Sequence, residues 1–343
     1  MWNMHWMRWP IYGPAFIAMG IAAWGMWKNL GLKAKFFQLA EKDDARREGM
    51  GGRLWFATQY VFGHGRILRD AYPGVMHFLL FFGMFMLFLV TLTVMAQEDF
   101  TALFFGYEFL HGPTYLVWSL IGDLFGISLL LGTIFAFVRR YVVKAKRLDS
   151  TPQELWAILL LFAMVFTGFL AEGLRMVGDG EVLKPWAPWS PLGWLIALGI
   201  NALDLGLGTI KAIHAVNWQI HLVLALVFIA TIPWSKFWHM VPGFLNVAYH
   251  NKAAKPDLPL LTMADLEDET RETFGIHRVD EFTWKDLFDT EACMRCGRCT
   301  AACPAHNTDK PLDPKKIIQD LKANVDDKIP RWLDAKGAAK EDV

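Results

Sequence analysis

The sequence predicts an all-α membrane protein, in which a bundle of five transmembrane helices precedes a small helical segment with four cysteines. Hydrophobic residues make up 54% of the 343 residues, including 26 Phe and 16 Trp. They occur in blocks too long for the core helices of a soluble domain, which indicates an integral membrane protein in a lipid bilayer. All four cysteines lie close together near the C-terminus. The formal net charge is zero, so we expect no nucleic-acid partner.

The five predicted spans are apolar stretches separated by polar loops. The first, residues 11–27, has no small-residue cleavage site and is followed by basic residues, so we interpret it as a retained span and not a signal peptide. Residues 28–70 are polar and basic, with an amphipathic pattern typical of a helix along the membrane surface. The other spans are residues 74–96, 116–138, 155–177 and 209–234, and we expect the last to continue to about Met240.

The charges of the loops predict the orientation. Residues 28–70 and 139–147 are rich in Lys and Arg, whereas residues 97–115 have neither and residues 178–208 have only Lys184. The positive-inside rule then places the N-terminus outside the cytoplasmic (inner) membrane and the C-terminal segment in the cytoplasm. A sixth span at residues 192–203 would place the C-terminal cysteine segment outside the cytoplasm. We therefore interpret that stretch as an interfacial or re-entrant helix.

The cysteines form the motif C-x2-C-x2-C-x3-C-P, with Cys293, Cys296, Cys299 and Cys303. Ferredoxin-type proteins bind a 4Fe-4S cluster through such a run. In two-cluster ferredoxins the fourth cysteine of each run ligates the other cluster, so Cys303 either binds this same cluster or belongs to a site that a further stretch of chain or a separate subunit completes. A zinc site is the alternative, but four thiolates so close in sequence do not easily complete a tetrahedron. Disulfides are disfavoured on the reducing side of the membrane. The sequence therefore predicts a transmembrane domain (residues 1–245), a linker (246–282) and a cytoplasmic 4Fe-4S ferredoxin-like domain (283–343).

Three histidines of the last span are candidate haem ligands. His214, His221 and His239 are separated by 7 and 18 residues, which places them on one face of a continuous helix. His221 and His239 would lie about 27 Å apart along its axis, a spacing that suits two stacked b-type haems. A single buried histidine is more often structural, but a row of three favours axial ligation.

A haem with two histidine ligands needs a partner from another helix. We pair His239 with His77, because both lie at the cytoplasmic ends of their spans. His221 has no evident partner, since the matching position of the second span is Phe88. In the alternative, His221 pairs with His77 and there is one haem. The weaker candidates for the outer side are His111 and His214, and we interpret His64 as an ordinary surface or interfacial histidine.

Three ionisable residues fall in the outer half of the spans: Asp123, Glu172 and Arg175. One interpretation is a structural ion pair between helices. The other is a quinone pocket or a clamp for a haem propionate, in which a carboxylate accepts the quinol proton and Arg175 binds the propionate.

Residues 221–239, with their 18-residue histidine spacing, resemble the last haem-bearing helix of the cytochrome b (gamma) subunit of respiratory nitrate reductase. His77 matches the first span-two ligand of that family, and Phe88 stands where its second ligand is expected. The fusion of such a domain to C-x2-C-G-x-C-x3-C-P is similar to the membrane iron–sulfur oxidoreductases of the heterodisulfide-reductase-like group. That resemblance covers nearly the whole chain.

One branch of this group passes electrons from electron-transfer flavoprotein to menaquinone. The resemblance therefore implies electron transfer between a cytoplasmic redox protein, such as that flavoprotein or a heterodisulfide-reductase-like subunit, and menaquinone, in either direction. A cysteine-rich domain normally follows in the group, so we expect one on a further stretch of chain or on a separate subunit. Alternatives are a non-catalytic haem-containing anchor or relay subunit, and a redox sensor, for which we identify no output domain.

Overall fold

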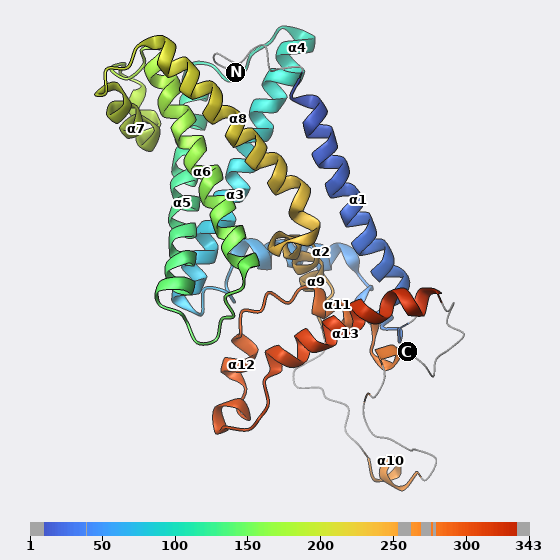
Figure 1. The fold of residues 1–343 in the computed structure, drawn as a ribbon. Coiled ribbons are helices and arrows are strands. Elements are labelled where there is room, and N and C mark those ends of the chain that lie inside the picture. Colours follow the sequence, from blue (N-terminus) through green and yellow to red (C-terminus); the bar gives the residue numbers. More distant parts are fainter. Residues whose placement is uncertain (1–9, 39, 253–261, 269–275, 277–278, 335–343) are drawn as a thin grey trace. The chain divides into compact units, whose positions relative to one another are not determined.

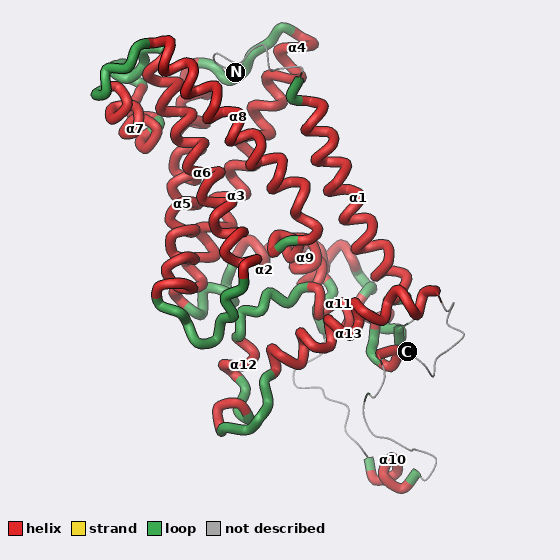
Figure 2. The backbone as a smooth tube through the Cα atoms, viewed as in Figure 1, coloured by secondary structure: helices red, strands yellow, loops and turns green. Residues whose placement is uncertain are grey.

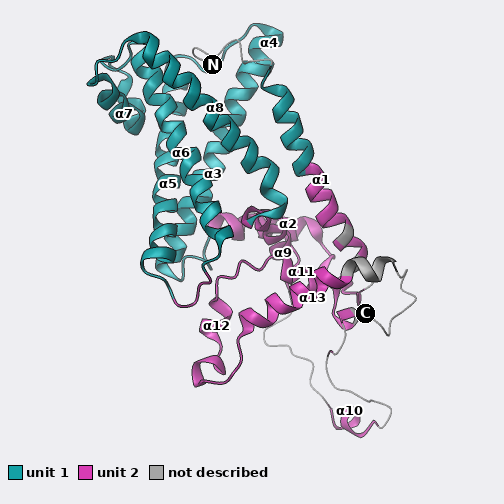
Figure 3. Cartoon of the chain, viewed as in Figure 1, with its two compact units in different colours: residues 1–22, 64–145, 150–235 teal, residues 23–63, 146–149, 236–343 magenta. Residues whose placement is uncertain are grey.

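The computed structural model describes residues 10–38, 40–252, 262–268, 276 and 279–334. They form two compact units (Figure 3). Unit 1 comprises Met1–Ala22, His64–Ala145 and Ser150–Ser235, and unit 2 comprises Ala23–Gly63, Lys146–Asp149 and Lys236–Val343. Much of the predicted linker, at residues 253–261 and 269–275, lies outside the described residues, as do residues 1–9 and 335–343.

The all-α class is confirmed. The described residues contain helices and one isolated β-bridge, between Glu41 and Thr283, and no strand (Figure 2). The α-helices are α1 (Tyr12–Phe37), α2 (Met50–Gly63), α3 (Ala71–Met95), α4 (Ala102–Phe105), α5 (Gly112–Phe137), α6 (Pro152–Gly178), α7 (Pro191–Asn201), α8 (Leu207–Thr231), α9 (Met240–Ala248), α10 (Met263–Glu267), α11 (Trp284–Glu291), α12 (Arg298–Ala302) and α13 (Pro314–Asp334).

Unit 1 holds four helices that are long and apolar enough to cross a membrane. These are Ala71–Phe105, in which a π-helical turn joins α3 to α4, then Gly112–Val142, Pro152–Gly178 and Leu207–Trp234. α5 packs against both α3 and α6, and α8 packs on α6 (Figure 1). The first predicted span falls in α1, which is not among these four, so the number of spans stays a prediction.

Helices α3 and α5 pack closely because glycines lie at their interface. A Cβ atom on Gly83 would come within 2.8 Å of the backbone nitrogen of Leu129, and one on Gly132 within 2.9 Å of that of Leu80. Small residues that let backbones approach are the usual means by which membrane helices associate.

The last predicted span is interrupted at its C-terminal end. α8 stops at Thr231 and is followed by two 3-10 turns, Ile232–Trp234 and Lys236–His239, with Ser235 extended between them. Pro233 explains the break, because it lacks an N–H group and its ring collides with the preceding helical turn. The expectation of one helix to Met240 is therefore wrong, and His239 does not continue the helical face of His214 and His221.

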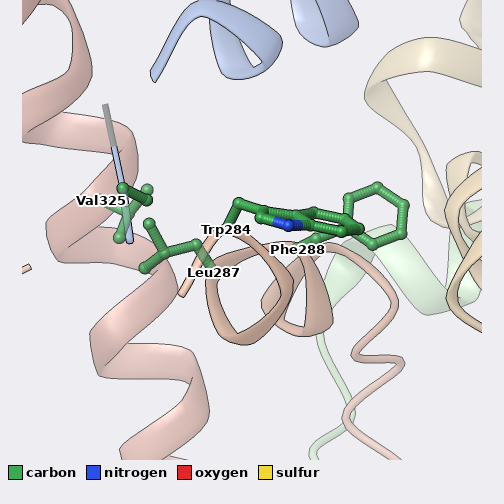
Figure 4. Packing of buried hydrophobic residues seen from close by; sticks show 5 residues of the cluster. Trp284, Leu287, Phe288 and Val325 are labelled. Atoms are coloured by element: carbon green, nitrogen blue, oxygen red, sulfur yellow. The ribbon is translucent and has the colours of Figure 1, made fainter. Parts of the chain in front are cut away.

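Unit 2 is organised around a small aromatic core. Trp284, Leu287 and Phe288 of α11 pack with Val325 of α13 (Figure 4). The Trp284 indole N–H donates a hydrogen bond to the carbonyl of Asp43 at 3.2 Å, which ties α11 to the segment before α2.

Arg53 of α2 holds a second part of unit 2 together. Its side chain is buried, and its guanidinium donates hydrogen bonds to four backbone carbonyls: Ala45 (2.7 Å), Glu48 (2.8 Å), Ala248 (3.3 Å) and His250 (2.7 Å). The planar fork of arginine can serve several acceptors at once, which a lysine ammonium cannot match.

We expect Arg53→Lys to lower the free energy of unfolding of unit 2 by about 2 kcal/mol, because at least one buried carbonyl loses its donor. Thermal unfolding of the purified protein in detergent would measure this. The matched control is Arg46→Lys, at a partly exposed ion pair with Asp43 (2.8 Å), for which a change of about 0.5 kcal/mol or less is expected. Equal effects of the two substitutions would contradict the role assigned to Arg53.

Candidate functional site

The four cysteines lie on one loop of unit 2, between α11 and the turn that follows α12. The Cys293 N–H donates to the carbonyl of Thr290 at 3.3 Å, and the Cys303 N–H to that of Thr300 at 3.1 Å. No cysteine forms a disulfide; Cys296 and Cys299 are exposed, while Cys293 and Cys303 are half-buried. The thiols at the tip of the loop are therefore accessible from outside this unit.

The loop turns tightly because two residues adopt left-handed backbone conformations. Arg295 has φ of 53° and Gly297 has φ of 69°. A Cβ atom on Gly297 would lie 2.4 Å from the carbonyl oxygen of Arg147, so the backbone of residues 146–149 passes directly against the glycine. Only glycine satisfies both the positive φ and the close approach.

The donor set fits a 4Fe-4S cluster. Four thiols on one loop, none of them in a disulfide, are the ligand type and number that a 4Fe-4S cluster needs. Within the described residues, no three His, Cys, Asp or Glu side chains are grouped closely enough to hold a single metal ion. A 4Fe-4S cluster does not require its ligands to converge on one metal ion, because each thiolate binds a different iron.

The C-terminal part of the cysteine loop, around Thr300, is fixed to the start of α13. The Asp313 carboxylate accepts hydrogen bonds from the Thr300 hydroxyl and from the N–H of Lys315 at 3.0 Å. The Thr300 hydrogen bond, supported by the amides at the start of α13, keeps the pKa of Asp313 below its usual value. Residues on both sides of Thr300 are thereby positioned, including Cys299.

A buried carboxylate, that of Glu291, fixes the N-terminal part of the cysteine loop, before Cys293. Glu291, two residues before Cys293, accepts hydrogen bonds from Lys33, Lys322 and the indole N–H of Trp238, the last at 3.2 Å. Burial alone would raise the pKa of Glu291, but the two lysines outweigh it and hold this pKa below its usual value. The Glu291 side chain is 4% exposed, so these partners replace its water.

Trp238 directly precedes the haem candidate His239. The His239 Nδ1 lies 2.5 Å from the carbonyl oxygen of Lys236, so Nδ1 carries the proton and donates it. In the neutral ring the lone pair is then on Nε2. Histidines that bind metals usually donate their other ring N–H to a carbonyl in this way.

His221 of α8 is held similarly. Its Nδ1 lies 2.9 Å from the hydroxyl of Thr167 in α6. That hydroxyl donates its own proton to the carbonyl of Ala163 at 2.7 Å, so the histidine Nδ1 is the donor to it. The imidazole lies over Gly168, where a Cβ atom would come within 3.4 Å of its Cε1.

His77 of α3 has a partner that the sequence did not indicate. Its Nδ1 lies 3.1 Å from Nε2 of His64. The interpretation of His64 as an ordinary surface or interfacial histidine is wrong, because the residue is 2% exposed and lies among aromatic rings of α3. The only sequence signal was the pair of glycines that flank it, Gly63 and Gly65.

The weaker haem candidates differ in their surroundings. His214 is buried in unit 1, whereas His111 is exposed and donates from Nδ1 to the carbonyl of Glu108 at 2.8 Å. Phe88, at the position that would hold a second ligand in α3, is 56% exposed within the described residues.

The ionisable residues Glu172, Arg175 and Asp123 have two sets of hydrogen-bond partners. Arg175 binds both carboxylate oxygens of Glu172, at 3.0 and 3.1 Å, and also contacts the Tyr115 hydroxyl at 3.1 Å. Its remaining partners are Asp179 and Glu181. Asp123 has other partners: its carboxylate accepts the N–H groups of Leu192 and Gly193, at 2.8 and 3.0 Å, and so caps the first turn of α7. Glu172 and Asp123 both lie next to Gly193.

Membrane-length apolar helices joined to a four-cysteine loop define a membrane-bound iron–sulfur protein. A family model described as a 4Fe-4S binding domain matches residues 284–305, which include all four cysteines. The class predicted from the sequence is thus confirmed for this loop.

The relatives carry the names of oxidoreductases and of a heterodisulfide reductase component. The EtfAB:quinone oxidoreductase of Syntrophomonas wolfei is 32% identical over 342 residues, which cover 97% of this chain and 46% of that protein. The probable iron-sulfur-binding oxidoreductase FadF of Bacillus subtilis is 28% identical over 270 residues (78% of this chain, 36% of FadF). A component of the dihydromethanophenazine:CoB--CoM heterodisulfide reductase of Methanosarcina thermophila is 32% identical over 180 residues (51% of this chain, 58% of that component).

These relatives confirm the resemblance to membrane iron–sulfur oxidoreductases of the heterodisulfide-reductase-like group. The chain spans about half the length of the curated relatives that it matches. No solved structure matches it.

We expect Gly297→Ala to reduce the cluster content of the purified protein severely. A left-handed alanine costs about 1–2 kcal/mol, and its Cβ atom would also overlap the carbonyl of Arg147. Non-haem iron and acid-labile sulfide per protein are the measurement. The control is Gly243→Ala in α9, where a Cβ atom meets nothing within 4 Å; full cluster content in both variants would show that the loop tolerates the displacement.

Proposed function

We propose that the chain transfers electrons between a soluble cytoplasmic redox protein and membrane menaquinone, through a 4Fe-4S cluster and b-type haem. The soluble partner would be an electron-transfer flavoprotein or a heterodisulfide-reductase-like subunit, and the proposal covers electron flow in either direction. The name of the relative from Syntrophomonas wolfei, a quinone oxidoreductase of EtfAB, supports this choice. The predicted orientation, with the N-terminus outside and the cysteine loop in the cytoplasm, is part of the proposal.

The observation that carries the proposal is the Trp238–Glu291 hydrogen bond inside unit 2 (3.2 Å). One partner is adjacent in sequence to His239, and the other lies two residues before Cys293. A candidate haem ligand and the cluster loop are thereby fixed within the same unit. Exposed Cys296 and Cys299 at the loop tip support exchange of electrons with a separate protein.

The histidines support haem binding through their tautomers. His221 and His239 each donate from Nδ1, which leaves the lone pair of the neutral ring on Nε2, the nitrogen that would bind iron. We keep the inner haem pairing predicted from the sequence, His77 with His239. A second haem at His221 is the further part of this prediction.

When bound, the cluster and the haem supply the one-electron chemistry. The chain's own contributions are ligand orientation and charge. Glu291 and Asp313 fix the two sides of the cysteine loop, and the positive charges of Lys33 and Lys322 lie on its N-terminal side. Thr167 and the carbonyl of Lys236 orient the histidine rings.

For the quinone, we propose the group around Glu172 and Arg175. Tyr115 and Ser190 add hydroxyl groups next to them: the Tyr115 oxygen accepts from Arg175, and the Ser190 hydroxyl lies 3.4 Å from Glu172 Oε1. Glu172 would accept the quinol proton. We do not propose the same role for Asp123, since it caps α7; it would shape this site by holding that helix.

The second candidate function is a haem-containing anchor or relay subunit without its own quinone site. The partners of Arg175 favour it, because this guanidinium already binds three carboxylates and one hydroxyl. A structural ion cluster inside a helix bundle is stable only when each charge is paired, and the Arg175 guanidinium meets this requirement.

The haem pairing is tested by His77→Ala and His239→Ala. Each should abolish the same haem, because a bis-histidine haem does not survive loss of either ligand. Reduced-minus-oxidised spectra and haem per protein, measured on detergent-purified material, would show this. Full haem content in either variant would make the pairing wrong, whereas a residual haem in both would be assigned to His221.

The two candidate functions are separated by Glu172→Gln. If the group binds quinone, this variant should lose at least about tenfold in quinone turnover, with haem and cluster content unchanged. Asp179→Asn is the matched control, because Asp179 contacts Arg175 through a single 3.2 Å interaction at the exposed edge. Equal turnover in both variants would favour the anchor.

A further inference from the structure

His64 is an unusual residue in unit 1, because it is a buried polar side chain in a strained backbone conformation. It has φ of 50°, in the left-handed region, and is 2% exposed. A left-handed conformation is disfavoured for a non-glycine residue because its Cβ atom crowds the following carbonyl oxygen, although histidine is among the residues that adopt it more readily. A buried imidazole adds a further desolvation cost unless it is hydrogen-bonded. Such outliers persist where the surroundings fix them, often at functional sites.

The turn that carries His64 is held firmly against α3. The His64 carbonyl accepts the N–H groups of both Ile67 and Leu68, each at 2.9 Å. The turn then rests on Gly74 in the first turn of α3, where a Cβ atom would come within 2.7 Å of the Ile67 carbonyl oxygen. The missing side chain at Gly74 therefore allows the turn to sit where it does.

The ring of His64 is enclosed by aromatic rings on the same helix face. Its centroid lies 4.7 Å from that of Phe81, 5.5 Å from Phe82 and 5.8 Å from Phe78. Its Nε2 lies 3.1 Å from Nδ1 of His77, and the two imidazole centroids are 5.2 Å apart. The apolar enclosure strengthens this hydrogen bond. Its direction depends on the tautomers of the two rings.

The hydrogen bond determines which nitrogen of His77 can bind iron. If His77 donates from Nδ1 to His64, the lone pair of its neutral ring is on Nε2. The opposite arrangement would place the proton on Nε2, and a protonated nitrogen does not bind a metal. Partners of this kind fix the tautomer and ring orientation of a metal ligand.

We propose that His64 is the positioning residue of a haem ligand: it accepts the Nδ1 proton of His77 and thereby directs Nε2 of His77 to the haem iron. This inference rests on the proposed function, because it needs His77 to be a ligand. It assigns to His64 no direct bond to the iron.

The experiment uses the full chain, purified in detergent with its haem, and the variants His64→Asn and His64→Gly. Both replacements tolerate a positive φ, so the backbone is retained. The rate of haem transfer to excess apomyoglobin should rise about 10–100-fold in His64→Gly. It should rise less in His64→Asn, whose side-chain oxygen still offers an acceptor. The low-spin EPR signal of the oxidised haem should shift in both variants.

Two further variants keep the test independent of misfolding. Gly74→Ala should also accelerate haem transfer, because it displaces the turn while His64 itself remains. His250→Asn is the control: this half-buried histidine stacks on Phe56 in unit 2, with centroids 4.3 Å apart, and its loss should leave transfer rate and EPR signal unchanged.

The outcomes separate the inference from the proposed function. Wild-type transfer rates and EPR signals in both His64 variants would overturn the positioning role while haem binding stands. Loss from both variants of the same haem that His77→Ala loses would make His64 a ligand and also overturn the positioning role. A wild-type protein without haem would overturn the proposed function itself, and the inference with it.

Discussion

The arrangement of unit 1 depends on one constraint: a polar atom inside an apolar helix bundle needs a partner within that bundle, because no water replaces it. The observed pairs follow from it. Asn217 donates to the carbonyl of Thr167 at 2.9 Å, and the hydroxyl of the same Thr167 accepts from His221. The constraint thus fixes α8 to α6 and, by the same contacts, sets the orientation of a candidate haem ligand. In the proposed function, the same hydrogen bonds would serve both helix packing and haem binding.

Asp123 shows how the constraint is met by backbone groups. The first N–H groups of a helix have no partner inside the helix, and α7 begins beside α5. The carboxylate takes two of these groups, and its charge is favoured at the positive end of the helix dipole. This explains how a short apolar helix of borderline length is held in place, and it accounts for Asp123 without a catalytic role.

The sequence was most informative where the chemistry is local. Four cysteines in eleven residues determine their own ligand geometry, so the cluster loop followed from spacing alone. The long apolar helices followed from composition. Pro233 is likewise a local signal for a helix break, since proline in a helix interior removes a hydrogen bond. The 18-residue histidine spacing, however, favours a continuous helix across this position. By contrast, the His64–His77 and Glu291–Trp238 contacts join residues 13 and 53 positions apart, and no periodicity encodes them.

The break after α8 has a consequence for the electron path. In a continuous α-helix, Trp238 and His239 would follow the register set by α8. In the 3-10 turn Lys236–His239, successive side chains point about 120° apart, and the direction of each is set inside unit 2. Trp238 there reaches the Glu291 carboxylate, while His239 is oriented by the carbonyl of Lys236. Because of the break at Pro233, the side-chain directions of Trp238 and His239 no longer follow from the helical turn of α8. The placement of His239 relative to Cys293 therefore depends on contacts within one compact unit and not on the length of α8.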